Sequence, residues 1–157
     1  MSVNAVPQGY HTITPNLTVR DAARTLEFYR NAFGAEEVMR MPGPDGKILH
    51  AEIKIGDSRV MITDEMPQMH NKGPKGYGGS PVNFYVYVND VDRAFDRAVG
   101  AGAKVLMGLE NMFWGDRTGQ VEDPEGHTWT FAQHIKDLTP AEMQSAQDDF
   151  MAKLTTR

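Results

Sequence analysis

His50 and Glu52 are the residues whose types and spacing most directly suggest chemistry. They are two positions apart in an alternating segment, so on a β-strand both side chains point to the same side. An imidazole beside a carboxylate can act as an acid and a base, or can supply two ligands to a divalent metal. A metal site needs a third ligand that the sequence does not designate. The alternative is a hydrogen-bonded structural pair.

The run from Phe113 to Arg117, FWGDR, is a second group that could bind a ligand. The guanidinium of Arg117 could hold an anion, and the indole of Trp114 could line the mouth of a cavity. The alternative is a structural contact between Asp116 and Arg117, with Trp114 filling the end of the fold. The sequence leaves open whether any of these residues catalyses a reaction.

Composition excludes several classes of protein. The chain has 157 residues, no cysteine and a formal net charge of −5, so thiol catalysis and a disulfide framework are excluded. The acidic balance, without a basic run, argues against nucleic acid as a partner. No segment resembles a signal peptide or a membrane helix, which predicts a cytoplasmic protein that does not bind membranes. Walker, Rossmann, zincin and nucleophile-elbow motifs are absent.

The elements that must position these residues occur twice. An alternating strand, an Asp-capped amphipathic helix ending in glycine, and three further strands predict a β-α-β-β-β module at 10–65 and again at 81–134. The later strands of the second module are expected at about 104–109, 119–122 and 127–132. A Gly/Pro-rich linker at 66–80 joins the modules. A C-terminal helix is predicted within 135–157, opened by a Thr139, Pro140 and Glu142 capping box.

Alternation in the strands separates an apolar face, which includes Ile13, from a polar one. The apolar face is expected to meet the helices. A polar sheet face is often simply solvated, but hydroxyl-bearing aromatics beside amides favour the wall of a cavity. We therefore predict an α+β fold of two curved, open-barrel sheets that enclose a small-molecule site. The predicted ligand-binding residues are Thr14, Asn16, His50, Glu52, Asn83, Tyr85, Tyr87, Trp114, Arg117 and Thr130.

The doubled module, the V-x-D-x-x-R helix entries at Val19 and Val88, and the segment EDPEGHTWTF from Glu122 to Phe131 resemble the vicinal oxygen chelate superfamily. This superfamily contains glyoxalase I, bleomycin resistance proteins and extradiol dioxygenases. The segments 47–65 and 113–127 are similar to its PhnB-like branch. The resemblance implies paired modules, a homodimer, and a ligand site in the concavity that two modules form.

Enzymes of this superfamily hold a divalent metal with His or Glu on the first and last strands of each module. The matching positions here lie near Thr14, Asn83, Thr130, and Ile62 or Thr63. Neutral hydroxyls and amides are poor metal ligands beside imidazole or carboxylate. The sequence therefore predicts no cofactor, with a divalent metal held by His50 and Glu52 as the alternative.

Three functions remain open from the sequence. The first is a metal-free, small-molecule-binding protein of the glyoxalase/bleomycin resistance type, active in resistance or sequestration. The second is a metal-dependent lyase or dioxygenase. The third is an interaction module whose cavity is filled by side chains.

Overall fold

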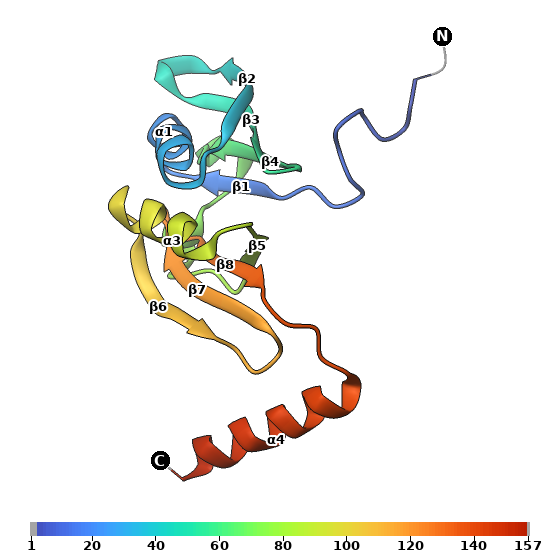
Figure 1. Ribbon diagram of the computed structural model, residues 1–157. Helices are drawn as coiled ribbons and strands as arrows, with labels where there is room; N and C mark the ends of the chain where they lie inside the picture. Colours follow the sequence, from blue (N-terminus) through green and yellow to red (C-terminus); the bar gives the residue numbers. More distant parts are fainter. Residues whose placement is uncertain (1–2, 157) are drawn as a thin grey trace.

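The computed structural model describes residues 3–156 and contains two four-stranded mixed sheets (Figure 1). The first sheet is formed by β1 (Asn16–Val19), β2 (Glu36–Pro42), β3 (Ile48–Ile55) and β4 (Ser58–Asp64), and the second by β5 (Asn83–Tyr87), β6 (Lys104–Asn111), β7 (Asp116–Glu122) and β8 (Thr128–His134). The strand orders are β1-β4-β3-β2 and β5-β8-β7-β6. Only β1/β4 and β5/β8 are parallel pairs. The predicted α+β fold with two open modules is confirmed.

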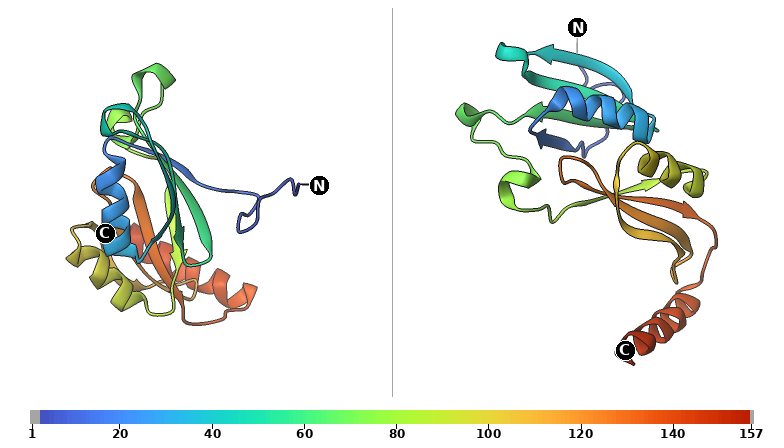
Figure 2. Two further views of the ribbon diagram at one scale, coloured as in Figure 1. Left: turned by 90° about the horizontal axis from the view of Figure 1, so that it is seen from above. Right: turned by 90° about the vertical axis from the view of Figure 1, so that its left-hand side faces the viewer.

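One long helix follows the first strand of each module, α1 (Ala22–Phe33) and α3 (Val91–Gly100). The side chains of Asp21 and Asp90 accept hydrogen bonds from backbone N–H groups in the first turns, as the cap pattern predicted. Gly34 ends α1 with a φ of 67°, a left-handed conformation that costs glycine little. Both helices lie on the same side of the sheets, and the N-terminal segment leaves on the other side (Figure 2).

Aromatic packing joins the two modules into one hydrophobic core. Tyr29 and Phe33 of α1 contact Trp129 of β8, with ring centroids 5.4 and 4.8 Å apart. Phe33 also packs against Phe131, and Phe84 of β5 packs against Trp129. Each pair buries a large apolar area in a favourable tilted or edge geometry. Helix α1 thus packs against the sheet of the other module as well as its own.

A buried carboxylate fixes this contact at the β7–β8 turn. Asp123 accepts hydrogen bonds from the Tyr29 hydroxyl at 2.5 Å and from the Trp129 indole N–H at 2.9 Å. Its other oxygen accepts from the backbone N–H groups of Glu125 and His127. Burial, and then Asp123, raise the pKa of Tyr29 well above its ordinary value, so Tyr29 is a neutral donor. The DPEGH segment is therefore a structural turn.

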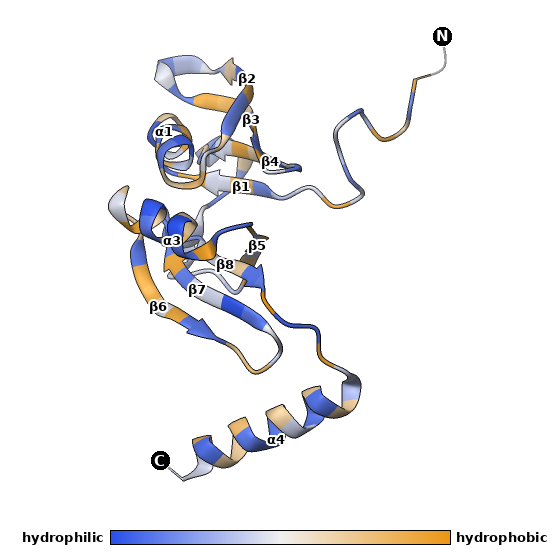
Figure 3. Cartoon of the chain, viewed as in Figure 1, coloured by the Kyte–Doolittle hydropathy of each residue, from blue (hydrophilic) through white to orange (hydrophobic). Residues whose placement is uncertain are grey.

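Two short turns and two further helices complete the chain: η1 (Pro44–Gly46), η2 (Pro67–Met69), α2 (Pro74–Tyr77) and α4 (Pro140–Thr155). The predicted capping box of Thr139 and Glu142 opens α4. None of the α4 residues is buried, and the helix stands apart from both sheets with mixed polar and apolar residues (Figure 3). Among the residues that the structure describes, its one aromatic contact joins Phe150 to Phe113, with ring centroids 5.1 Å apart. No helix within residues 3–156 is long and apolar enough to span a membrane.

Several strand boundaries differ from the prediction. Ile13 lies before β1 and is 86% exposed, so its predicted place on the buried face is wrong. In the second module, β7 begins at Asp116 and β8 continues to His134. The backbone N–H of Met112 donates to the carbonyl of Asp116 at 2.7 Å, and Gly115 turns the chain at a φ of 98°. Because Gly115 lies in this tight hairpin turn, the FWGDR run has the composition of a loop, and the sequence did not show that β7 already begins at Asp116.

Candidate functional site

A cavity of about 640 Å³ lies along the free edge of β5, between the two modules. It is bordered by β5, the segment before β1 and the turn between β3 and β4. Four of the predicted ligand-binding residues line it, Thr14, Asn83, Tyr85 and Tyr87. Other lining residues, which sequence reasoning did not select, include His11, Phe33, Arg59 and Trp129. A volume of this size suits a small organic molecule.

Asn83 and Thr130 form a fixed amide–hydroxyl pair on the polar face of the second sheet. The Asn83 amide donates to the Thr130 hydroxyl at 2.9 Å, and that hydroxyl lies 3.1 Å from the amide oxygen. Gln120 donates to the same hydroxyl from β7 at 3.3 Å. The parallel register that places Tyr85 opposite Thr130 keeps these groups side by side. The structure therefore brings together three of the predicted ligand-binding residues, Asn83, Tyr85 and Thr130.

Asp116 is the centre of the polar network on this face. One of its carboxylate oxygens accepts from the hydroxyls of Tyr85 and Tyr87, at 3.1 and 2.9 Å. The other lies 2.8 Å from Nδ1 of His134. The indole of Trp114 donates to the Tyr85 hydroxyl at 3.4 Å. Asp116 is buried whereas the two tyrosines are exposed, so a fixed carboxylate orients aromatic rings that face solvent.

Sequence reasoning missed the roles of Asp116 and His134. They meet because they are paired residues in the antiparallel β7–β8 ladder. Alternation continued past the predicted end of β8 would have placed His134 on the same face as Thr130. His127 lies just before β8 and takes no part in this network, because its ring contacts the carbonyl of Thr18 at 3.3 Å. No local pattern indicated Asp116.

The pKa values within this network favour charged His134 and Asp116 and neutral tyrosines. Burial by itself raises the pKa of Asp116, but hydrogen bonds from His134, Tyr87 and Tyr85 together outweigh burial and lower it. Hydrogen bonds to Asp116 and Asp137 raise the pKa of His134. Burial raises the pKa of Tyr85, and the hydrogen bond to Asp116 raises that of Tyr87. Both tyrosines therefore remain hydrogen-bond donors at neutral pH.

The raised pKa of His134 predicts a pH-dependent contribution to stability. Its partners favour imidazolium in the folded state, so the contribution is complete below its ordinary pKa of 6.5 and is lost as pH rises through the raised folded pKa. Urea unfolding of wild type and His134→Asn, compared between about pH 5 and pH 9, should show a difference in unfolding free energy that shrinks with increasing pH. A difference that grows with pH would contradict the pairing, and Asp137→Asn should reproduce part of the effect.

His50 and Glu52 form a hydrogen-bonded pair on the first sheet, with Nε2 and Oε1 3.0 Å apart. The hydroxyl of Tyr10 donates to the other oxygen of Glu52. Hydrogen bonds from Tyr10 and then His50 lower the pKa of Glu52, which is therefore ionised at neutral pH. Neither His50 nor Glu52 lines the cavity along β5. His50 and Glu52 therefore form the hydrogen-bonded structural pair that the sequence analysis gave as the alternative to a catalytic or metal-binding pair.

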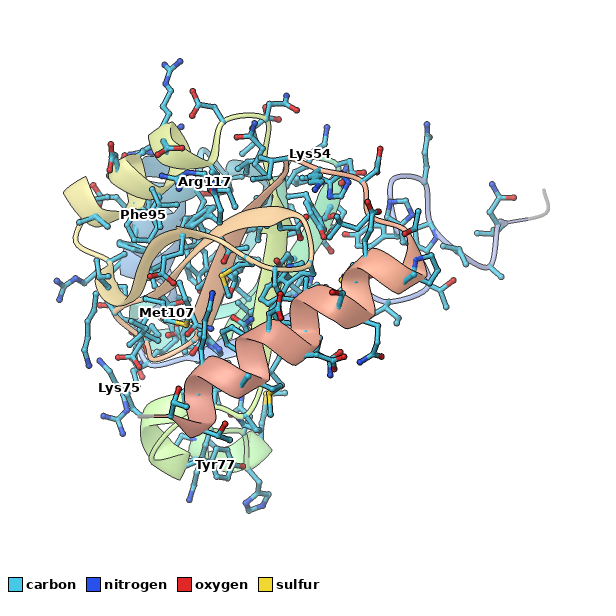
Figure 4. All side chains as sticks on the ribbon, turned by 60° about the horizontal axis from the view of Figure 1, so that its bottom comes forward. Lys54, Lys75, Tyr77, Phe95, Met107 and Arg117 are labelled. Atoms are coloured by element: carbon cyan, nitrogen blue, oxygen red, sulfur yellow. The ribbon has the colours of Figure 1, made fainter. Side chains whose placement is uncertain are left out.

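Arg117 lies on the helix side of the second sheet, away from the cavity (Figure 4). Its guanidinium makes two hydrogen bonds to Asp92 of α3, at 2.8 and 2.9 Å, and a third to Asn111. The proposed contact between Asp116 and Arg117 is wrong, because neighbouring residues on β7 point to opposite faces. Asn16 is exposed on β1 and does not line the cavity.

The donor atoms at these positions do not fit a metal centre of the superfamily type. Ile62 points into the core, fully buried, and Thr63 donates to the carbonyl of Leu49. His50 and Glu52 supply one imidazole and one carboxylate, and residues 3–156 contain no group of three or more His, Cys, Asp or Glu side chains arranged to hold an ion. A protein site for a divalent metal usually needs at least three such ligands.

Two βαβββ modules with a cavity between them are the architecture expected for the superfamily that the sequence resembles. Comparison with known sequences identifies the same superfamily. The profile of the Glyoxalase/Bleomycin resistance protein/Dioxygenase superfamily matches residues 10–131, and the chain belongs to this superfamily. It is similar to the uncharacterized protein Rv0887c of Mycobacterium tuberculosis (strain H37Rv), with 43% identity over 149 residues, 93% of this chain and 85% of that protein.

Solved structures show the same fold. The chain resembles TioX from Micromonospora sp. ML1, with 31% identity, a TM-score of 0.65, and coverage of 80% of this chain and 99% of TioX. It also resembles the PhnB protein from Bacillus cereus, described as a putative 3-demethylubiquinone-9 3-methyltransferase, with 20% identity and a TM-score of 0.62 over 78% of this chain and 99% of that chain. At 20% identity, the likeness to the PhnB protein shows a shared fold.

Proposed function

We propose that this protein binds a small organic molecule in the cavity along β5, without the usual metal centre, and serves in resistance or sequestration. The observation that carries the proposal is the cavity wall itself. Tyr85 and Tyr87 expose their rings there while Asp116 holds their hydroxyls in place. A wall that is ordered before binding reduces the entropy lost when a ligand is bound.

Native mass spectrometry of freshly purified, untagged protein tests this proposal. We expect a retained small molecule or binding of an added one, no stoichiometric metal, and a homodimer, as superfamily membership suggests. About one equivalent of metal per subunit, lost in His50→Ala together with an activity, would contradict the metal-free proposal and favour a lyase or dioxygenase. Fractionation of cells would test the proposed cytoplasmic location.

Removal of the aromatic anchors should weaken binding. Tyr85→Ala removes a ring that lines the cavity, and Trp114→Ala removes the indole that donates to the Tyr85 hydroxyl from outside the cavity lining. Each change is expected to reduce the affinity for N-phenyl-1-naphthylamine, an uncharged aromatic probe, by about 1–3 kcal/mol, the range typical of aromatic anchors. Probe fluorescence titrations give the dissociation constants. Tyr77→Ala is the matched control, because Tyr77 lies on α2, is 72% exposed and does not line the cavity. Unchanged affinity in both Tyr85→Ala and Trp114→Ala would remove these residues from the site.

A further inference from the structure

Arg59 on β4 has a buried guanidinium nitrogen without a hydrogen-bond partner. Among residues 3–156, its Nη1 is the only buried side-chain nitrogen or oxygen atom in this situation. No carboxylate of the described chain lies within ion-pairing distance of it. An unsatisfied buried donor is unfavourable, and more so when it is charged. Arg59 also lines the cavity along β5.

The N-terminal segment holds this guanidinium in place. The Cζ atom of Arg59 lies 5.6 Å from the centre of the Tyr10 ring, a cation–π arrangement. The backbone at Gly9 is close enough that a Cβ there would lie 3.2 Å from Nη2 of Arg59. The nearby carboxylate of Glu52 is already hydrogen-bonded to Tyr10 and His50. The positive charge of Arg59 is thus positioned but not paired.

A second cation lies directly opposite. Lys54 on β3 is the cross-strand partner of Arg59 in the β3–β4 ladder. Like charges in such a pair destabilise a sheet. Lys54 also has Glu36 of β2 as its cross-strand partner on the other side, but neither Lys54 nor Arg59 has an ion pair within the part of the chain that the structure describes. Asp57, in the turn between the two strands, also lines the cavity, but its recorded hydrogen bond is with Ser58 at 3.1 Å. An anion from outside the chain would offset the repulsion.

We infer that Arg59, supported by Lys54, receives the oxyanion of a ligand whose aromatic part lies in the cavity beside Tyr85. The inference rests on the proposed function and deepens it, because it names the ligand class: an aromatic carboxylate, sulfonate or phosphate. A guanidinium binds such oxyanions through two parallel N–H groups. The inference also assigns to Arg59 the anion-binding role that the sequence suggested for Arg117.

Two fluorescent probes that differ only by an anionic group test the inference. They are 1-anilinonaphthalene-8-sulfonate and its uncharged parent, N-phenyl-1-naphthylamine. In Arg59→Gln, the sulfonate should bind about tenfold more weakly, the effect of losing one charge-assisted hydrogen bond, while affinity for the parent stays within about twofold, well below that effect. Arg24→Gln, which removes the same charge from the outer face of α1, should change neither affinity.

The outcomes separate the inference from the proposed function. If wild type binds both probes and Arg59→Gln weakens neither, or weakens both equally, the anion site is refuted while the binding cavity stands. If neither probe binds wild type, the proposed function fails and the inference fails with it. If both probes bind but Tyr85→Ala leaves both affinities unchanged, the inference fails, because it places the aromatic part of the ligand beside Tyr85, while binding of a small molecule stands. Displacement of the sulfonate by benzoate or by phenyl phosphate supports the site and shows which oxyanion it prefers. Displacement by neither overturns it.

Two further variants keep the inference testable if Arg59→Gln does not fold. Circular dichroism establishes whether each variant is folded. Lys54→Gln alters an exposed side chain on β3 and should weaken sulfonate binding about threefold, in line with the loss of a solvent-screened charge. Arg59→Lys keeps the charge but not the paired N–H groups, and its affinity should fall between those of wild type and Arg59→Gln. Sulfonate affinity equal to wild type in both variants would overturn the inference.

Discussion

Asp123→Ala is expected to lower the free energy of unfolding by about 4 kcal/mol, because it leaves several buried donors without an acceptor. These donors are the Tyr29 hydroxyl, the Trp129 indole and the backbone N–H groups of Glu125 and His127. Asp123 is 3% exposed, so water cannot readily replace the carboxylate. Urea unfolding followed by circular dichroism measures the change. A loss below about 1 kcal/mol would show that these donors find other partners.

Two controls locate the effect. Tyr29→Phe removes a single donor and should cost about 1–2 kcal/mol. Asp57→Ala removes an exposed carboxylate from a turn and should change stability by less than about 0.5 kcal/mol. If Asp57→Ala and Asp123→Ala lost the same free energy of unfolding, a general loss of negative charge would be the cause. The buried hydrogen bonds of Asp123 would then not account for the effect.

Gly115→Ala is expected to destabilise the protein by about 3 kcal/mol, through steric overlap and backbone strain together. A Cβ at Gly115 would lie 2.1 Å from the backbone carbonyl oxygen of Lys136, and the φ of 98° is unfavourable for alanine. The carbonyl of Gly115 accepts hydrogen bonds from the N–H groups of Ile135 and Lys136. Relief of the overlap would therefore move the chain next to His134 and weaken its contact with Asp116.

Gly46→Ala is the matched control for Gly115→Ala. Gly46 also has a positive φ, 73°, but a Cβ there would meet no atom within 4 Å. The control should therefore cost only about 1 kcal/mol, the conformational term alone. NMR titration of His134 adds a second measurement, since its pKa should move back toward the ordinary value in Gly115→Ala only. Equal destabilisation of both variants would rule out the steric contact as the cause.

Local features of the fold could be predicted from the sequence because they depend on residues close together in the chain. The Asp21 and Asp90 caps, the end of α1 at Gly34, and the capping box of α4 are all formed within a few residues. Alternation correctly placed Asn83, Tyr85 and Tyr87 on one face of β5, opposite the core. The repeat of such local units was enough to predict two βαβββ modules.

The candidate site depended on contacts that no local pattern encodes. Asp116 meets Tyr85 and His134 only because β7 starts at a hairpin turn whose boundary the glycine obscured. Arg117 pairs with Asp92 across the sheet–helix interface, a contact that depends on how α3 packs against β7. The placement of Arg59 beside the cavity depends on how the two modules pack.

The sequence by itself therefore determined the order of the strands and of the helices α1, α3 and α4, and which face of most strands is polar. The tertiary structure alone decided which polar groups meet, which are already paired, and that Arg59 is not. The physical reason is that periodicity fixes the direction of a side chain relative to its own strand or helix. Its partners across the sheets depend on strand register and module packing, which are set by the aromatic core around Trp129.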